Sequence, residues 1–426
     1  MIRIMKYGEE PNERIFARAA GPSGVEEAVS AILAAVREGG DAALREMTLR
    51  FDRVDPGALE VTEREKADAV KEAGADFMRI LHRAAENIRH FHEKQVRASF
   101  LVNDQPGVVM GQKVIPLDRV GLYVPGGTAA YPSTVLMDAI PAVIAGCPEV
   151  VMVTPPGRDG RVSAAILAAA EEAGVKRVFK VGGAQAIAAL AYGTQTVPKV
   201  DKIVGPGNAY VVEAKKQVFG RVAIDMIAGP SEILVLADGK SNPEWVAADL
   251  LSQAEHDRVA SAVLVTDSAE LAVKVQAEIE RQIVLLPRQE ITRESVERNG
   301  KIIVAQTLRT AIDIVNEIAP EHLEICVDNP FDYLDAIRHA GSIFLGRWCP
   351  EALGDYMAGP NHTLPTMGTA RFSSPLSVDD FVKKTQYTYF TADALKNLSA
   401  DVAAFARREG LEAHARSALV REGGGE

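Results

Sequence analysis

The feature of this sequence that most constrains its fold is a regular alternation that begins near Asp118. Short runs rich in β-branched residues alternate with helical patterns of ten or more residues. Such alternation is typical of βαβ units, in which consecutive strands pair in parallel. The expected strands of a first sheet are residues 119–125, 149–156, 177–183 and 201–207, and the expected helices are residues 136–146, 163–174, 184–193 and 208–220.

The same rhythm starts again after residue 238 and predicts a second sheet of the same kind. Its expected strands are residues 260–267, 301–307, 322–327 and 342–346, and its expected helices are residues 244–257, 268–286, 309–319, 330–341 and 350–359. Helical spacing also covers residues 24–52, with a Gly-Gly break, residues 63–95, and the last 26 residues, interrupted at Gly410. The predicted fold class is therefore α/β, with two doubly wound, incomplete Rossmann-like parallel-sheet domains and small helical elements at both termini.

Composition and charge exclude several classes of function. The chain of 426 residues has a net charge of −11 and no basic patch, so we expect no nucleic-acid partner. Its three cysteines, Cys147, Cys326 and Cys349, lack metal-site spacing and form no even disulfide set, which favours a cytoplasmic location. The longest uncharged run, residues 120–137, is broken by Gly and Pro. We therefore expect no membrane span, and the N-terminus shows no signal peptide.

Glycines gather just after three of the expected strands, in VPGG (124–127), VGGAQA (181–186) and VGPGNAY (204–210). Glycine at the carboxyl end of a parallel strand lets backbone N–H groups approach a phosphate. None of the loops is a full dinucleotide fingerprint, so each alone is compatible with a plain turn. Together they favour a phosphate-bearing cofactor, which Tyr123, Gln185 and Asn208 are placed to contact.

Three pairs of polar residues lie near expected helix ends or loops, and each has two interpretations. Gln253 and His256 are three residues apart on one helix face, where they are able to converge on a metal. The other two pairs are Asp355 with His362 and Glu409 with His414. Taken singly, the three pairs are also compatible with a solvated helix end, a turn histidine and a surface helix.

The stretch IAPEHLEIC (318–326) sets Glu321 directly beside His322 before an expected strand. A histidine that titrates near neutrality suits acid–base catalysis, and a glutamate suits activation of water. The alternative is an ordinary polar turn. Cys326 is compatible with a thiol nucleophile for aldehyde oxidation or, more simply, with a small buried residue.

Eight segments of the chain together resemble the histidinol dehydrogenase family over nearly the whole length. They are GLYVPGGTAAYPSTVLM, KIVGPGNAYVVEAKK, DMIAGPSEILVLAD, DLLSQAEHD, APEHLEI, GSIFLG, PEALGDYMAGPNHTLPT and RFSSPLSVDDF. The resemblance implies an NAD-dependent, zinc-containing enzyme that acts last in histidine biosynthesis. It implies oxidation of L-histidinol to L-histidine in two steps, through an enzyme-held aldehyde and with two NAD.

The resemblance also implies a role for each matching residue. The acid–base pair would be Glu321 and His322, and the NAD contacts would be Tyr123, Gln185 and Asn208. One Zn²⁺ per subunit would be held by Gln253, His256, Asp355 and His414. The substrate contacts would be Ser231, Gln253, His256, His322, Asp355, Glu409 and His414. His362 lies in a family motif near the site.

The family resemblance further implies a homodimer with a composite active site, completed by the C-terminal segment of the partner. The expected domains are a small accessory domain (1–24 and 376–400), a first Rossmann-like domain with the zinc and catalytic residues (25–118 and 237–375), a second with the NAD loops (119–236), and a tail (401–426). Residues Trp348, Cys349 and Pro375 depart from the family pattern, away from every proposed ligand.

Two other functions are weighed against this one. A dehydrogenase of the same fold acting on another amino or sulfonated alcohol would keep the NAD loops and the Glu-His pair. It would have less reason to keep Glu409 and His414, which read the imidazole end of histidinol. A non-catalytic nucleotide-binding regulatory protein would have no reason to keep four spaced metal ligands.

Overall fold

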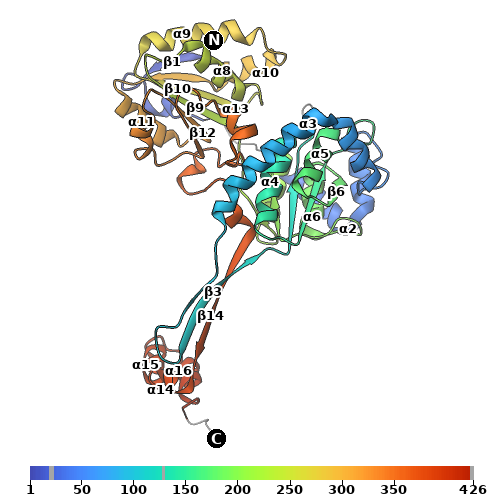
Figure 1. Cartoon of the computed structure of the whole chain (residues 1–426), viewed down its shortest axis with the longest axis vertical. Helices are drawn as coiled ribbons and strands as arrows, with labels where there is room; N and C mark the ends of the chain where they lie inside the picture. The colour runs from blue at the N-terminus through green and yellow to red at the C-terminus, as the bar shows by residue number, and fades with distance from the viewer. Residues whose placement is uncertain (19–23, 127–129, 423–426) are drawn as a thin grey trace. The chain divides into compact units, whose positions relative to one another are not determined.

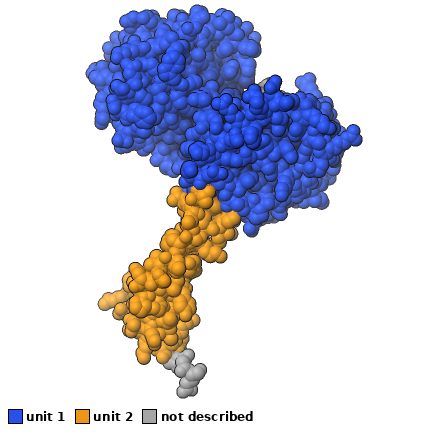
Figure 2. Space-filling view, viewed as in Figure 1, with its two compact units in different colours: residues 1–95, 117–381 blue, residues 96–116, 382–426 orange. Residues whose placement is uncertain are grey.

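The structure is a computed structural model that describes residues 1–18, 24–126 and 130–422. The chain forms two compact units (Figure 2). Unit 1 comprises residues 1–95 and 117–381, and unit 2 comprises residues 96–116 and 382–426. The finer four-part division expected from the sequence stays a prediction.

A five-stranded parallel sheet in unit 1 has the order β6-β5-β4-β7-β8, which is 3-2-1-4-5 in chain order within this sheet (Figure 1). Its strands are β4 (Arg119–Tyr123), β5 (Glu149–Thr154), β6 (Arg177–Lys180), β7 (Lys202–Val204) and β8 (Ala223–Ile224). The helices that follow strands β4 to β7 are α4 (Pro132–Ile144), α5 (Ala164–Ala173), α6 (Gly183–Tyr192) and α7 (Ala209–Val218). Successive strands are added on one side of β4 up to β6 and on its other side from β7 onward. The place between β4 and β7 is therefore the topological switch point of the sheet.

The six-stranded sheet of unit 1 repeats that order and adds the N-terminal strand at its edge, as β1-β11-β10-β9-β12-β13. Its strands are β1 (Arg3–Lys6), β9 (Glu232–Ala237), β10 (Ser261–Thr266), β11 (Lys301–Val304), β12 (His322–Cys326) and β13 (Ser342–Leu345). Its helices are α8 (Pro243–Ala254), α9 (Ala269–Ile283), α10 (Gln289–Arg298) and α11 (Leu308–Ile318), with short turns α1 (Asn12–Ile15) and α12 (Phe331–Leu334). The α/β class and the two parallel sheets predicted from the sequence are confirmed.

Side-chain alternation explains why both faces of each sheet are covered by helices. Leu122 and Met152 pack into one core with α4 and α5, whereas Val151 and Phe179 pack into another with α6 and α7. Central strands buried on both faces consist of nearly continuous apolar runs, as the sequence showed. The six-stranded sheet divides in the same way between α8–α10 and α11.

The two expected N-terminal helices are α2 (Glu26–Phe51) and α3 (Glu63–His92), and they pack against the helices of the five-stranded sheet, α2 on α6 and α7 and α3 on α4 and α5 (Figure 1). The Gly-Gly break is confirmed, because Gly40 has a φ of 54° inside α2. Thr62 and Glu65 form a capping box that begins α3. None of the described helices combines the length and the apolar character needed to cross a membrane.

Unit 2 contains an antiparallel ribbon that the sequence did not predict. Strand β14 (Val382–Phe390) pairs with β3 (Val108–Pro116), and β3 also pairs with β2 (Phe100–Val102). The ribbon carries α14 (Ala392–Lys396), α15 (Ser399–Arg408) and α16 (Glu412–Leu419). The predicted interruption at Gly410 is confirmed, because Gly410 separates α15 from α16 with a φ of 77°.

Two expected helices are much shorter than predicted. Residues 330–341 form only α12, because Asn316 takes up backbone groups that a longer helix would use: its side chain donates to Ala336 O at 2.8 Å and accepts from Arg338 N at 2.7 Å. Residues 350–359 form α13 (Glu351–Leu353) and a π-helical turn, η2 (Gly354–Ala358), that ends at Gly359. The remaining short helical turns are η1 (Glu93–Gln95), η3 (Thr369–Arg371) and η4 (Val378–Phe381).

Candidate active site

The predicted catalytic pair lies at the amino end of β12, which is paired between β9 and the edge strand β13 of the six-stranded sheet. His322 is the first residue of the strand and Glu321 directly precedes it, and both are buried. Ser231, a predicted substrate contact, directly precedes the neighbouring strand β9. Gln253 and His256 lie at the C-terminal end of α8, which returns the chain to this amino edge. The structure therefore gathers these five predicted residues along one edge of one sheet.

The backbone of a single residue, Glu232, positions both members of the pair. Its N–H donates to Glu321 Oε2 at 2.7 Å, and its carbonyl oxygen accepts from His322 Nδ1 at 3.0 Å. A carbonyl oxygen only accepts, so Nδ1 of His322 carries a proton, and Nε2 is the ring atom left to exchange a proton with a substrate. That Nε2 is buried and has no hydrogen-bond partner among the described residues. Arg18 in turn holds the Glu232 side chain through two hydrogen bonds of 2.6 and 2.9 Å.

Acidic groups from the start of α13 and from η2 face His322. His322 Nε2 lies 3.7 Å from Glu351 Oε1, and the other carboxylate oxygen of Glu351 accepts from Ser252 Oγ at 3.2 Å. His322, Glu351 and Asp355 each have a side-chain nitrogen or oxygen atom able to bind a metal ion, and these three atoms all lie within 4.8 Å of one another. Asp355 Oδ1 also lies 3.5 Å from Nδ1 of His362, so these two candidate residues lie close together.

The protonation states of these groups follow from burial and from their neighbours. Burial raises the pKa of Glu321 well above its ordinary value, and the charges of Glu232 and Asp355 raise it further, against the Glu232 N–H bond. Burial also raises the pKa of Glu351, with the charge of Asp355 adding to the effect. For Asp355, burial is outweighed by the hydrogen bond and charge of His362, which lower its pKa to about 2. The site thus holds an ionised Asp355 beside two carboxyl groups that bind protons more readily.

The predicted metal ligands of unit 1 carry atoms that fit a cation. The side-chain oxygen of Gln253, Oε1, is buried and unpartnered among the described residues. Burial lowers the pKa of His256 despite the nearby charge of Asp355, which favours the neutral imidazole that metals bind. Together with the carboxylate of Asp355 these give one nitrogen and two oxygen donors, a set compatible with zinc.

The predicted NAD residues lie along the carboxyl edge of the five-stranded sheet, with Tyr123 and Asn208 at its switch point and Gln185 after the edge strand β6. Tyr123 ends β4, and its buried hydroxyl accepts from Gly183 N at 3.1 Å. Gln185 is buried in the first turn of α6, and Asn208 caps α7 by accepting from Tyr210 N and Val211 N. Gly205 has a φ of 114°, and a Cβ there would overlap the carbonyl oxygen of Tyr123. Gly127 of the first glycine segment lies outside the described residues.

The loop that carries His362 joins the candidate site to the five-stranded sheet. Asn361 Nδ2 donates to Met137 O at 2.7 Å, and Thr363 Oγ1 donates to Asp138 Oδ1 at 2.8 Å. Both acceptors belong to α4, the helix that follows the first glycine segment. The loop that carries His362 is therefore hydrogen-bonded to α4 on both sides of that residue.

Glu409 and His414 belong to unit 2. Glu409 is the C-cap of α15 and His414 lies in α16, and both are exposed. Their predicted roles rest on a second copy of the chain and stay predictions.

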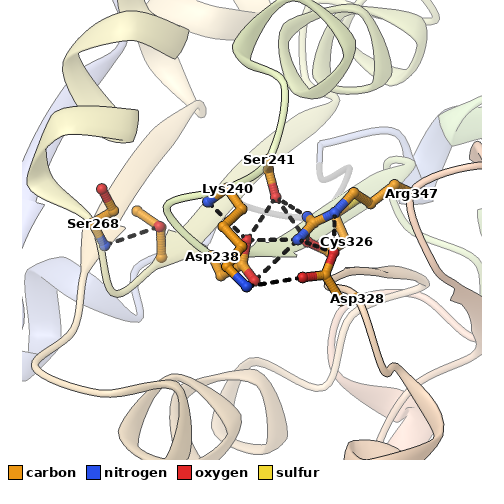
Figure 3. A network of polar contacts seen from close by, with 8 residues as sticks. Asp238, Lys240, Ser241, Ser268, Cys326, Asp328 and Arg347 are labelled. Atoms are coloured by element: carbon orange, nitrogen blue, oxygen red, sulfur yellow. Dashed lines mark hydrogen bonds and ion pairs between the residues drawn. The ribbon is translucent and has the colours of Figure 1, made fainter.

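The carboxyl edge of the six-stranded sheet, where ligands bind in many α/β folds, is closed by a polar network (Figure 3). Arg347, which follows β13, donates to both carboxylate oxygens of Asp238 at 2.9 and 3.1 Å and to Asp328 at 3.1 Å. It also donates to Ser241 Oγ at 2.6 Å, and Ser241 in turn holds the carbonyl of Cys326 at 2.8 Å. At the ends of β9, β12 and β13 these polar groups are therefore hydrogen-bonded to one another.

The environment of Cys326 favours the simpler of its two interpretations. Its side chain is buried, and burial together with the charges of Glu324 and Asp249 raises the pKa of the thiol. A thiol that stays protonated is a poor nucleophile, so Cys326 acts as a buried packing residue.

Sequence reasoning missed Glu232 and Glu351. Glu232 contacts the catalytic pair through its backbone N–H and carbonyl, which every residue has. The residue type at this position therefore gave no indication of the role. Glu351 had a weak signal, because it directly follows Pro350 at an expected helix start, one helical turn before Asp355.

Two parallel sheets, glycine segments at the carboxyl edge of one and a buried Glu-His pair at the amino edge of the other place the chain among α/β proteins with buried acid and base groups. The histidinol dehydrogenase family model matches residues 17–422. The histidinol dehydrogenase of Clostridium acetobutylicum is 54% identical over 99% of both chains, and that of Geobacillus kaustophilus is 57% identical over 94% of this chain and 95% of its own. The chain belongs to the histidinol dehydrogenase family, which makes it an oxidoreductase of histidine biosynthesis.

Solved structures agree with this assignment. Histidinol dehydrogenase from Elizabethkingia anophelis matches with a TM-score of 0.93 and 36% identity, over 99% of this chain and 98% of its own. An acetylating aldehyde dehydrogenase from Geobacillus thermoglucosidasius matches with a TM-score of 0.50 and 14% identity, over 86% of this chain and 97% of its own. The second likeness concerns the fold alone.

Proposed function

We propose that this chain oxidises L-histidinol to L-histidine through L-histidinaldehyde, with reduction of two NAD. The observation that carries the proposal is the state of His322. Its Nδ1–H is held by Glu232 O, which leaves a buried and unpartnered Nε2 at the centre of the candidate site. An alcohol has a pKa far above neutrality, so loss of hydride from the carbinol carbon requires a base within reach.

In the first step His322 Nε2 takes the hydroxyl proton while the carbinol carbon transfers hydride to NAD, which gives the aldehyde and NADH. In the second step water adds to the aldehyde carbon, and Glu321 takes the proton from that water. The addition gives the monoanion of the gem-diol, which transfers the second hydride to a second NAD and becomes the carboxylic acid. That acid releases its remaining proton to solvent and becomes the carboxylate of histidine. The burial that raises the pKa of Glu321 makes its ionised form a stronger base than an exposed glutamate.

The metal implied by this function is one Zn²⁺ per subunit, held by Gln253, His256, Asp355 and His414 of the partner subunit. When bound, zinc supplies a Lewis acid that attracts the amine and imidazole of the substrate. The support in this chain is the orphaned Gln253 Oε1, the lowered pKa of His256 and the lowered pKa of Asp355. Ser231 and His322 complete the substrate contacts from unit 1.

The proposal includes a homodimer in which Glu409 and His414 of one subunit, on the tail of residues 401–426, complete the site of the other. Unit 2 supports this because it exposes an unusual number of large apolar side chains. Among these are Phe100 at 54%, Leu101 at 56%, Tyr389 at 59% and Phe405 at 70% exposure. Apolar surface of this kind marks an interaction site, and a second copy of the chain is the occupant we propose.

NAD is proposed to bind at the switch point of the five-stranded sheet, with contacts from Tyr123, Gln185 and Asn208. Gly205 supports the placement, because a side chain there would overlap Tyr123 O, so glycine lets β4 and β7 end close together at the switch point, where dinucleotides bind in such sheets. The N-terminus of α7, a helix of ten residues, directs backbone N–H groups and a partial positive charge at the same place.

The test is a turnover assay of the purified protein with L-histidinol and NAD, with and without a chelator. We expect two NADH for each histidine formed, loss of turnover after chelation and recovery on addition of Zn²⁺. Absence of turnover in zinc-loaded protein contradicts the proposal. A product ratio of one NADH for each aldehyde released contradicts the two-step assignment.

A further inference from the structure

Strand β12 carries a second buried acid, Glu324, two residues beyond His322 and on the same face. Its exposed fraction is 0%, and it is the central residue of the strand. Its carboxyl group is hydrogen-bonded to that of Asp249, and the donor atoms of Glu324, Asp249 and Cys326 lie within 4.8 Å of one another. Burial and the charge of Asp249 raise the pKa of Glu324, so the two carboxyl groups share a proton.

The other oxygen of Glu324 holds the start of α13. Glu324 Oε1 accepts from the backbone N–H of Glu351 at 2.6 Å. The first N–H groups of a helix have no partner within the helix, and a buried one requires a side-chain acceptor. Glu351 is the residue whose Oε1 is buried and unpartnered opposite His322 Nε2, and Asp355 follows it by one helical turn.

Asp249, the hydrogen-bond partner of Glu324, lies on α8. It precedes Gln253 by four residues, so the two lie on one face of that helix, and His256 follows two residues after the helix ends. Ser252 adds a second link from α8, because its hydroxyl donates to Glu351 Oε2 at 3.2 Å. The Asp249–Glu324–Glu351 connection therefore joins the three elements that carry His322, the Gln253–His256 pair and Asp355.

We propose that Glu324 is a positioning residue that fixes α8 and α13 against β12, and thereby sets the spacing of Gln253, His256 and Asp355 for zinc. Glu324 contacts neither the substrate nor the metal in this role. The inference rests on the proposed zinc site. Partners that orient metal ligands from behind typically change metal affinity by about 10- to 100-fold when they are removed.

Three variants of the zinc-loaded protein test this role, with the zinc dissociation constant measured by competition with a chromogenic chelator. Glu324→Leu removes both hydrogen bonds and is expected to weaken zinc binding roughly tenfold or more. Glu324→Gln keeps an acceptor for Glu351 N–H and a donor for Asp249, so its dissociation constant stays within about twofold of the unmodified protein. Asp249→Ala breaks only the link to α8 and is expected to weaken zinc binding severalfold.

The control is Asn316→Ala, which removes a buried side chain that joins α11 to the chain at residues 336–338 on the opposite face of the same sheet. It is expected to lower the melting temperature without changing zinc affinity. Equal zinc affinity in folded Glu324→Leu and in the unmodified protein overturns the positioning role. If Glu324→Leu does not fold, unchanged affinity in Asp249→Ala overturns it instead. An unmodified protein that binds no zinc refutes the proposed function and not the connection between the helices.

Discussion

The two parallel sheets of unit 1 share one strand order but differ in the edge that carries chemistry. In the five-stranded sheet the glycine segments and Asn208 lie at the carboxyl ends of the strands, and Asn208 lies at the switch point. In the six-stranded sheet Glu321 and His322 lie at the amino end of β12, and the carboxyl edge is filled by Arg347 and its partners. Strand order alone therefore does not decide where an α/β sheet places its reactive groups.

The difference follows from what each edge offers. A carboxyl edge with glycines and helix N-termini offers N–H groups, which suit a phosphate. The amino edge of the six-stranded sheet receives the C-terminal end of α8 and the loop before β12, which bring imidazole and carboxyl groups together. One sheet is thus suited to hold a cofactor, and the other to move protons beside it.

The largest effect on turnover is expected from His322→Asn, at the amino edge of the six-stranded sheet. The amide cannot accept the carbinol proton as imidazole does, so kcat should fall about 10³-fold for both histidinol and histidinaldehyde. Steady-state NADH formation with each substrate measures this. His90→Asn, at an exposed position of α3, is the matched control and should leave both rates unchanged.

A smaller and selective effect is expected from the adjacent residue. Glu321→Gln removes the base for water but keeps an oxygen for Glu232 N–H, so aldehyde oxidation should slow about 100-fold while the alcohol step changes little. Single-turnover measurements started from histidinol and from histidinaldehyde separate the two steps. Full-rate aldehyde oxidation in this variant refutes the division of roles, and Glu317→Gln on the exposed side of α11 serves as the control.

Gly205→Ala tests the proposed NAD site at the carboxyl edge of the five-stranded sheet. A methyl group at a φ of 114° overlaps Tyr123 O and shifts the end of β4 or β7. The KM for NAD should rise about tenfold while zinc content stays constant, whereas an unchanged KM would show that NAD does not approach this backbone. Gly174→Ala has a φ of 81° but open space around it, so it should cost about 1 kcal/mol of stability without a change in KM.

The smallest effect on turnover is expected at the closed carboxyl edge of the six-stranded sheet. Arg347→Met leaves Asp238 without its cation, and both side chains are mostly buried, at 15% and 17% exposure. The free energy of unfolding should fall by about 2–3 kcal/mol, while kcat and both KM values stay within twofold. Urea unfolding and steady-state kinetics measure the two quantities, with Lys274→Met of an exposed helical pair as the control. A large loss of turnover would show that this edge takes part in the reaction.

Much of the fold could be predicted because each sheet consists of local βαβ units. Strand β5 and helix α5 are visible in a window of about 25 residues, since burial on both faces leaves a continuous apolar run. The ribbon of unit 2 was missed for the opposite reason. Most side chains of β14 are exposed, and its partner β3 is distant in the sequence, so no local pattern marks either strand.

The candidate site was predictable to the extent that it depends on side chains within specific motifs. Glu321, His322, Gln253, His256 and Asp355 were all found in that way, through the family resemblance. Contacts through backbone atoms, such as those of Glu232 with the catalytic pair, depend on the register of β9 against β12 and leave no trace in composition. The shortening of α12 by Asn316 is a tertiary effect of the same kind.

The ribbon of unit 2 has a consequence for the synthesis of the chain. Strand β3 leaves the ribosome long before β14, its partner from Val382 to Phe390. At about 5–20 residues per second the delay between them is roughly 15–50 s. During that interval β3 has β2 on one side and an unpaired edge on the other, while both sheets of unit 1 are being completed from the intervening residues. Unit 2 is therefore the last part of the chain to assemble, and its unpaired edge makes the growing chain most open to association with neighbouring chains before release.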